Sequence, residues 1–263
     1  MADRTVGLLH PGEMGAAVGA ELRRLGTPVL WASEGRGDET ARRAADAGLE
    51  DVGSARELAR RSDVVLSICP PHAALDLARS VGGFDGTYVD ANAVAPGTAR
   101  AVAEIAGARS VDGGIVGPPP SPSVGTHLYL SGSEAGSVAD LFAGTAVDAR
   151  VVSDTVGDAS AVKVAYAAWT KGTAAMLLAI RSYAESAGIE QTLSAEWRET
   201  LPELPEVLAR AERSAHAKGW RWIGEMEEIA AAFAAEDLPA GFHEAAAEVY
   251  REHAREWQRG VPS

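Results

Sequence analysis

The residues with the clearest chemistry lie in one turn near the start of the chain. Thr5 to Gly15 read T-V-G-L-L-H-P-G-E-M-G, in which the apolar run Val6–Leu9 leads into a glycine turn and then a helix. The free N–H groups and the positive dipole end of such a helix can receive a pyrophosphate. Gly12 would let the backbone approach the phosphates, and Gly15 would let the helix pack close to the strand. The turn therefore predicts that a dinucleotide binds here.

This turn departs from the usual G-x-G-x-x-G pattern at its first position, where His10 stands in place of glycine. The alternative interpretation is an ordinary strand-to-helix turn that binds nothing. If a dinucleotide does bind, we expect the residues that follow the strand to contact it, namely His10, Pro11, Gly12, Glu13 and Met14.

The choice of dinucleotide should be made at the end of the expected second strand, Val29–Ala32. An acidic side chain there would bind the ribose hydroxyls of NAD, and a cation would bind the extra phosphate of NADP. Ser33 can donate a hydrogen bond to a phosphate, and Arg36 offers a planar guanidinium that suits one. Glu34 would favour NAD if its carboxylate turned inward. Arg42 and Arg43 lie one turn into the next helix, and the alternative for all three arginines is that they only solvate an exposed helix. We expect NADP (NADPH) as the cofactor.

The elements that position these residues alternate over an expected dinucleotide-binding domain, residues 1–155. Short apolar runs alternate with helical stretches, as a doubly wound parallel sheet of the Rossmann type requires, so the fold class is α/β. Strands are expected at Val6–Leu9, Val29–Ala32, Val64–Cys69, Thr87–Asp90 and Ser110–Asp112, with a short one near Leu49–Val52. Helices are expected at Arg56–Arg61, Ala73–Val81 and Thr98–Ala106.

Residues 156–263 are expected to form a small, all-helical domain for substrate binding or dimerisation. Ser160–Ser186 supports one helix on the order of 40 Å long. Further helical segments are Ser194–Glu199, Glu206–Ala217, Ile223–Ala235 and Gly241–Trp257. Five of the six tryptophans fall in this part, which indicates extensive packing or a partner surface. Because the apolar sides of the long helix need another surface to bury them, a homodimer is expected.

Composition excludes several classes of partner. The 263 residues carry a formal net charge of −13, and the pI is near 4.9, so neither nucleic acid nor an anionic membrane is an expected partner. Cys69 is the only cysteine, which precludes an internal disulfide, and we find no signal peptide or apolar run of about 18 residues. A soluble, cytoplasmic protein with a small-molecule substrate and no metal is expected.

Five segments then stand in a recognisable order along the chain: Val6–Gly15, Asp63–Pro70, Tyr88–Asn92 with Pro96, Val111–Gly114 and Gly157–Lys163. Their order and intervals resemble the beta-hydroxyacid dehydrogenase superfamily, which also contains 6-phosphogluconate dehydrogenases and, more distantly, imine reductases. The resemblance covers roughly residues 5 to 190, after which Gly219–Met226 resembles a variant C-terminal domain found on some members. It implies an oxidoreductase that transfers hydride between a nicotinamide and a small carbonyl or hydroxy compound.

The resemblance places the catalytic position at Lys163, which would give a proton to the carbonyl oxygen or take one from the hydroxyl. Burial and the positive nicotinamide of the oxidised cofactor would both lower its pKa. At about 100° per residue, Ala167 and Thr170 share nearly its helical face, with Tyr166 beside them. The family's asparagine four residues on is Ala167 here, so its supporting hydrogen bonds come from Tyr166, Thr170 or Lys171, or are lost. The alternative is a lysine that only solvates the helix.

Two loops at the carboxyl ends of strands should complete the cofactor site. Cys69 ends one strand, and Pro70 and Pro71 follow it and would hold the nicotinamide half. His72, next in the loop, is expected to touch cofactor or solvent rather than act in catalysis. Asn92 stands where the family usually has serine or threonine near the nicotinamide and substrate. Its amide can donate and accept, which makes a catalytic hydrogen-bonding role the prediction, and an Asx turn is the alternative.

The largest departure from the family lies in Val116, Gly117 and Pro118, where a serine and two glycines usually hold the substrate carboxylate. Val116 has no hydroxyl and Pro118 has no N–H, so the carboxylate clamp is partly dismantled. Val116 and Gly117, with Thr170 and Lys171, are the expected substrate residues. The loss favours an imine as an alternative substrate, although an ammonium at Lys163 would repel an iminium. A non-catalytic NADP-binding protein is a third alternative, indicated by the absent asparagine.

In the last domain, Trp222, Met226, Ile229 and Phe233 recur at helical spacing and are expected to be core. Glu225 and Glu228 lie on another face. Acidic groups that faced the cleft would suit a cationic substrate, but a solvated face is the interpretation we favour.

Overall fold

The computed structural model describes residues 4–259, with the side chains of residues 255–259 left out of the description. The chain divides into two compact units, Met1–Val164 and Ala165–Ser263. Across residues 4–259, every helix is too short or too polar to cross a membrane.

The first unit is built on one eight-stranded sheet in the order β3-β2-β1-β4-β5-β6-β7-β8. All neighbouring strands pair in parallel except β6 and β7, which are antiparallel. The strands are β1 Val6–Leu8, β2 Val29–Trp31, β3 Glu50–Asp51, β4 Val64–Ser67, β5 Thr87–Asp90, β6 Ser110–Val116, β7 Thr126–Ser131 and β8 Val147–Ser153. The six expected strands are confirmed. β7 and β8 were not predicted, and β6 continues past the expected end at Asp112.

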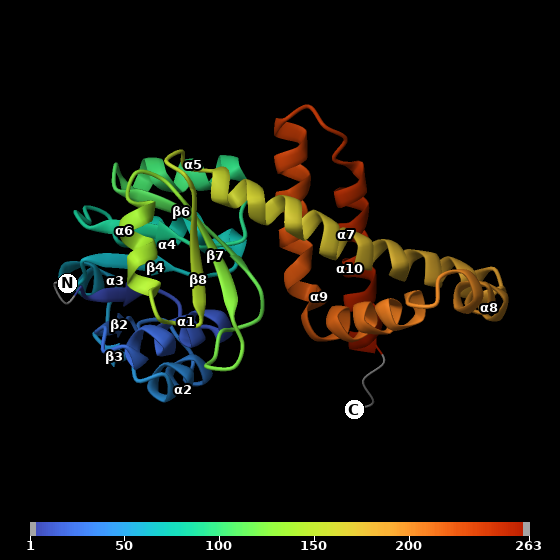
Figure 1. Ribbon diagram of the computed structural model, residues 1–263, viewed down its shortest axis with the longest axis horizontal. Coiled ribbons are helices and arrows are strands. Elements are labelled where there is room, and N and C mark those ends of the chain that lie inside the picture. Colours follow the sequence, from blue (N-terminus) through green and yellow to red (C-terminus); the bar gives the residue numbers. More distant parts are fainter. Residues whose placement is uncertain (1–3, 260–263) are drawn as a thin grey trace. The chain divides into compact units, whose positions relative to one another are not determined.

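Helices cover both faces of this sheet, as a doubly wound fold requires (Figure 1). Alternate residues of β1 point to opposite faces, so Leu8 packs with Leu22 of α1 while Leu9, just after the strand, packs with Leu58 of α3. One face carries α1 Glu13–Arg24, α2 Asp38–Asp46 and α6 Ala135–Ala139, and the other carries α3 Ala55–Arg61, α4 Ala74–Ser80 and α5 Pro96–Ala106. Short 3-10 turns occupy Pro71–Ala73 (η1) and Asp140–Phe142 (η2).

The strand order reverses direction at β1, which lies between β2 and β4. Val6 is level with Val29 of β2 and with Val64 of β4, so the carboxyl ends of the three strands lie side by side. Ligands of open α/β sheets bind at such a switch point, because the loops there diverge to opposite faces. The fold thus brings the loops after β1, β2 and β4 together.

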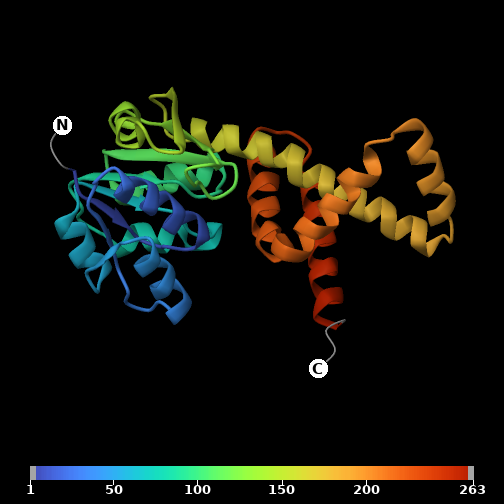
Figure 2. The same ribbon diagram turned by 60° about the horizontal axis from the view of Figure 1, so that its bottom comes forward.

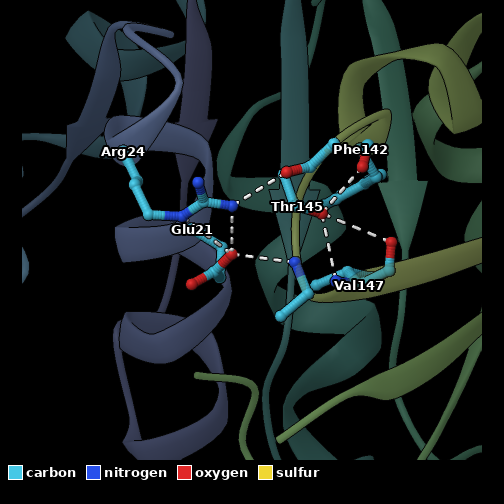
Figure 3. A network of polar contacts seen from close by, with 7 residues as sticks. Glu21, Arg24, Phe142, Thr145 and Val147 are labelled. Carbon is cyan, nitrogen blue, oxygen red and sulfur yellow. Dashed lines mark hydrogen bonds and ion pairs between the residues drawn. The ribbon is translucent and has the colours of Figure 1, made fainter. Parts of the chain in front are cut away.

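A buried carboxylate ties α1 to the chain that enters β8 (Figure 3). Glu21 accepts hydrogen bonds from the Ala146 N–H at 2.8 Å and from Arg24 at 3.0 Å, and Arg24 also donates to the Gly144 carbonyl at 2.8 Å. Burial alone would raise the pKa of Glu21, but these hydrogen bonds outweigh it and hold the pKa below its usual range. The helix that follows the glycine turn is therefore anchored at its far end.

The second unit is helical. The expected long helix is α7 Asp158–Ser186, which begins in the first unit and continues into the second. It is followed by α8 Glu190–Thr200, α9 Leu204–Ala235 and α10 Gly241–Arg259. The prediction of two separate helices at Glu206–Ala217 and Ile223–Ala235 is wrong, because both belong to α9. Figure 1 and Figure 2 show that α9 changes direction along its length, and its later part runs beside α10. Met226 and Ile229 are buried, as expected.

Candidate active site

The turn after β1 has the geometry of a phosphate cradle. Gly12 is the N-cap residue of α1, and the helix start has no side-chain cap of its own. A Cβ on Gly15 would lie 2.5 Å from the His10 carbonyl oxygen, so only glycine lets the helix come this close to the strand. A Cβ on Gly12 would lie 3.1 Å from two ring atoms of His10. The expected packing role of Gly15 is confirmed, and the turn fits a pyrophosphate.

His10 and Arg36 meet where the carboxyl ends of β1 and β2 lie side by side. Arg36 donates from Nη2 to the Leu9 carbonyl at 3.3 Å, and its own N–H closes a turn on the Ser33 carbonyl at 3.0 Å. Burial, and then the charge of Arg36, lowers the pKa of His10. Nδ1 of His10 and Nε of Arg36 are both buried without a hydrogen-bond partner among the described residues. Two orphaned nitrogens at this place fit an anionic group of a cofactor.

The other charged residues of the β2 loop are less well placed for a phosphate. Arg43 is paired with Glu39 of the same helix, and Arg42 is exposed. Glu34 is also exposed, and its backbone N–H donates to Gly53 at 2.8 Å. Arg36 is therefore the cation of this loop that lies against the β1 turn.

Asn92 is buried at the end of β5, and its amide is engaged within the protein. Its oxygen accepts the Cys69 N–H at 2.5 Å, and its NH₂ group donates to Ser67 at 3.2 Å and to Asp90. Asn92 thus links the end of β5 to the loop after β4. A direct contact with substrate stays a prediction.

The loop after β4 holds Cys69 as a thiol. Burial, and then the charge of Asp90, raises the pKa of Cys69 to about 12, so it supplies no thiolate nucleophile near neutral pH. Pro70 is the N-cap residue of η1 and Pro71 is its first residue, which gives the loop a rigid course. His72 is exposed on this turn, in agreement with a position at solvent.

Lys163 lies one turn into α7 and contacts the strand it faces. Its Nζ donates to the Ile115 carbonyl of β6 at 2.7 Å. Gly114 allows this approach, since a Cβ there would lie 2.8 Å from the Ala159 carbonyl oxygen and 2.9 Å from Cβ of Lys163. Burial lowers the pKa of Lys163 to about 8, in the expected direction. An amine with this pKa exchanges protons readily near neutral pH.

Asp112 of β6 organises the start of α7, a role that the sequence analysis missed. Its Oδ2 accepts the N–H groups of Gly157 at 3.0 Å and Ser160 at 2.8 Å, and its Oδ1 accepts the Ser160 hydroxyl at 2.6 Å. Ser131 of β7 adds a hydrogen bond to Oδ2 at 3.1 Å and accepts the Ala159 N–H at 3.0 Å. A negative charge at a helix N-terminus is favourable, and here it is buried and fully engaged. An aspartate inside an apolar strand was the available signal.

The loop that corresponds to the family's carboxylate clamp is the connection between β6 and β7, residues 117–125. The Val116 carbonyl accepts the Thr126 hydroxyl at 3.0 Å, and the Val116 side chain is buried. Gly117 has φ +131°, and a Cβ there would lie 2.5 Å from the Thr126 hydroxyl oxygen. Ser121 and Val124 then close the loop with two backbone hydrogen bonds at 2.9 and 3.0 Å. These contacts hold the loop that connects β6 to β7, and the sequence did not predict this connection because it did not predict β7.

The remaining predicted residues, Tyr166, Thr170 and Lys171, belong to the second unit. Tyr166 is half exposed, and the Thr170 hydroxyl donates to its carbonyl at 3.1 Å. Lys171 instead points into its own unit, where it forms a mostly buried ion pair with Glu225 of α9. A role for Lys171 toward substrate, or in support of Lys163, stays a prediction.

Glu225 is therefore not part of a solvated face, and that interpretation was wrong. Its partner Lys171 also lies 5.7 Å from the centre of the Trp222 ring, and the Lys171 carbonyl accepts the Tyr250 hydroxyl at 2.7 Å. The sequence did not indicate the pair because its members are far apart along the chain. The positive charge of Lys171 and the negative charge of Glu225 thus neutralise each other within the second unit.

Solved structures with the same architecture define the class of fold. A conserved protein of unknown function, described as structurally similar to 3-hydroxyacid dehydrogenases, superposes with a TM-score of 0.72 at 24% identity, over 98% of this chain and 100% of that one. Mycobacterium tuberculosis 3-hydroxyisobutyrate dehydrogenase, solved with L-serine, gives 0.73 at 18% identity, over 96% and 94%. A reductive aminase and an imine reductase share the fold more distantly. The expected structural relationship to these enzymes is confirmed for the fold.

A sequence relative and a domain model place the chain more narrowly. It is 30% identical over 186 residues to the uncharacterized 28.5 kDa protein in the 7S RNA 5' region of Methanothermus fervidus, a match that covers 70% of this chain and 72% of that protein. Residues 184–253 match a domain of unknown function, DUF1932. The chain belongs to the family of the Methanothermus protein. The expected variant C-terminal domain is this DUF1932 domain.

Proposed function

We propose that the protein is an NADPH-dependent oxidoreductase that transfers hydride between the nicotinamide and a small carbonyl or hydroxy compound, with Lys163 as general acid or base. The observation that carries this proposal is the position of Lys163. Its Nζ lies 2.7 Å from the Ile115 carbonyl oxygen, and burial of the side chain lowers its pKa to about 8. Bound NADPH would supply the hydride, and the protein would supply the proton.

The cofactor would be held at the carboxyl ends of β1, β2 and β4. The start of α1, with Gly12 at its N-cap, would receive the pyrophosphate, and Ser33 and Arg36 would receive the phosphate specific to NADP. The rigid loop of Pro70 and Pro71 would lie along the nicotinamide half. A reductive aminase of the same fold, from Aspergillus terreus, has been solved with NADPH, which supports this class of cofactor.

The proton chemistry follows from the pKa of Lys163. With a pKa of about 8, the ammonium form outnumbers the amine about ten to one at pH 7, and either form is reached at little cost. An ammonium has three N–H groups, of which one is directed to the Ile115 carbonyl, so the side chain is oriented while others remain to meet a substrate oxygen. This arrangement suits proton donation during carbonyl reduction and proton removal during alcohol oxidation.

The substrate would differ from a simple 3-hydroxy acid. The Val116 side chain is buried and its carbonyl accepts the Thr126 hydroxyl, so this loop lacks the hydroxyl that the family directs at a carboxylate. The same observation favours imine reduction as the second candidate function, and reductive aminases share the fold. The retained ammonium at Lys163 opposes it, because a positive group beside an iminium is repulsive.

Self-association belongs to the same proposal. Trp169, Met176 and Tyr183 follow one another at intervals of seven residues on α7, and they are 71%, 53% and 69% exposed. Residues seven apart share one face of a helix, so this apolar stripe is suited to a second copy of the chain. We place the homodimer in the cytoplasm, in keeping with a single cysteine, Cys69.

The direct test is turnover of NADPH with two panels of substrates, one of small aldehydes and ketones and one of preformed imines. The proposal predicts oxidation of NADPH with members of the carbonyl panel and little with imines. Turnover confined to the imine panel would establish the second candidate. NADPH binding with no turnover on either panel would favour the non-catalytic alternative.

A further inference from the structure

His10 occupies a position where a dinucleotide-binding turn usually has glycine. Its ring lies against the turn, with Cε1 and Nδ1 within 3.1 Å of where a Cβ of Gly12 would be. Nδ1 is buried and has no hydrogen-bond partner among residues 4–259. Buried ring nitrogens are normally paired, so this one calls for a ligand.

Arg36, in the neighbouring loop, also has a buried nitrogen without a hydrogen-bond partner among the described residues. Its Nη2 donates to the carbonyl of Leu9, the residue just before His10, and its Nε is buried without a partner in the described structure. Because β1 and β2 pair in parallel, with Leu8 level with Trp31, the loops that carry His10 and Arg36 leave the sheet together. One nitrogen of each side chain, Nδ1 of His10 and Nε of Arg36, is thus buried at neighbouring loops without a partner in the described structure.

We propose that His10 and Arg36 together bind the phosphate on the adenosine ribose that distinguishes NADP from NAD, which makes His10 a specificity-determining residue. This inference rests on the proposed function, since it assumes that a dinucleotide occupies the turn. Arg36 supplies a permanent charge with a planar array of donors. His10 supplies a second donor and, when protonated, a second charge.

The charges around His10 favour this role. Arg36 faces it from the loop after β2 and Arg43 from α2, and Arg43 is already paired with Glu39. Burial and the two arginines lower the pKa of His10, against the hydrogen bonds with its own carbonyl and the Ile68 carbonyl, which raise it. A phosphate placed between His10 and Arg36 would reverse that balance, because it favours the protonated ring.

The sign of the pH dependence follows. If the phosphate raises the pKa of His10, NADPH binding takes up a proton, and its affinity falls as the pH rises from about 6 to about 8. NADH lacks the phosphate, so its affinity should stay nearly constant over this range. The discrimination between the two cofactors is therefore expected to be greatest near pH 6.

The experiment measures dissociation constants for NADPH and NADH at about pH 6, 7 and 8, with wild type, His10→Gln and His216→Gln. His216 is exposed on α9, in the second unit, and serves as the matched control. For wild type we expect NADPH binding to weaken about tenfold across this range. His10→Gln should abolish that dependence and lower the preference for NADPH about tenfold near pH 6, with NADH unchanged.

Two further measurements keep the inference open to contradiction. His10→Gly restores the usual glycine, and a folded variant of this kind should show the same loss of preference as His10→Gln. Adenosine 2',5'-bisphosphate, which lacks the nicotinamide, should raise the pKa of His10 followed by NMR, whereas adenosine 5'-phosphate should not.

The outcomes separate this inference from the proposed function. NADPH preference and pH dependence that survive in both His10 variants would overturn the role of His10 and leave an NADP-dependent enzyme intact. Failure of wild type to bind either cofactor would overturn both. Binding with the expected His10 effect but without turnover would support the phosphate site and contradict the oxidoreductase.

Discussion

Asp112 accepts two hydrogen bonds from Ser160, at Oδ1 from the hydroxyl at 2.6 Å and at Oδ2 from the backbone N–H at 2.8 Å. This contact joins β6 to the first turn of α7, three residues before Lys163. The same strand provides the Ile115 carbonyl that Lys163 contacts. One strand therefore sets both the start of the helix and the position of the Lys163 amine.

Asp112→Asn should destabilise the protein. Asparagine keeps one acceptor oxygen but no negative charge, so the Ser160 hydroxyl loses its acceptor and the bonds from the Gly157 and Ser160 N–H groups become weaker. We expect a loss of about 3 kcal/mol in the free energy of unfolding, measured in urea. Ser160→Ala, which removes only the hydroxyl bond to Oδ1 and keeps the backbone N–H, is the control and should cost about 1.5 kcal/mol. Equal stability of Asp112→Asn and wild type would contradict the assignment.

Gly15→Ala should disrupt the phosphate turn. The added Cβ would lie 2.5 Å from the His10 carbonyl oxygen, which is backbone and has little freedom to move. We expect α1 to shift from β1 and NADPH affinity to fall more than about tenfold in calorimetry. Gly97→Ala in α5 is the matched control, since its Cβ would meet nothing within 4 Å. Similar NADPH affinities in the two variants would argue against the cradle.

Trp169→Glu should weaken self-association. A charge at the first residue of the apolar stripe would be desolvated by a second copy of the chain, so the variant is expected to elute with the mass of one chain in light scattering. Phe242→Glu on α10 changes a side chain of the same exposure, 71%, away from the stripe, and should leave the mass unchanged. A wild-type protein with the mass of one chain would rule out the dimer.

The pKa of about 8 at Lys163 predicts opposite pH profiles for the two directions of the reaction. Carbonyl reduction needs the ammonium, so kcat/KM should fall about tenfold per unit above pH 8. Alcohol oxidation needs the neutral amine, so kcat/KM should rise with pH and level off above about 8. Profiles with no inflection between about pH 7 and 9 would exclude Lys163 as the group that moves the proton.

Local patterns in the sequence predicted much of the fold. Buried parallel strands such as Val64–Ser67 are apolar runs, and the glycine turn after β1 has a recognised spacing, so both could be identified. β7 was not identified because T-H-L-Y-L-S follows a proline-rich loop and pairs antiparallel to β6. The end of β6 was missed because Gly113 and Gly114 resemble a turn, whereas the close approach of neighbouring backbone requires them.

The candidate site was predictable only where one segment contains the chemistry. Gly12, Gly15 and Lys163 each belong to a local motif. Asp112 and the ion pair of Lys171 with Glu225 depend on contacts between residues that are distant in sequence, as in the 48 positions between Asp112 and Ser160. Such pairs are determined by tertiary packing, which a single sequence does not specify.

The most direct test of the central claim is turnover by Lys163→Met on the best carbonyl substrate of the panel. Methionine keeps the length and helix propensity of the side chain but has no proton to transfer. We predict that NADPH binds as in wild type while kcat falls by about a hundred- to ten-thousandfold. A Lys163→Met protein that turns over at nearly the wild-type rate would contradict the assignment of Lys163 as the general acid or base.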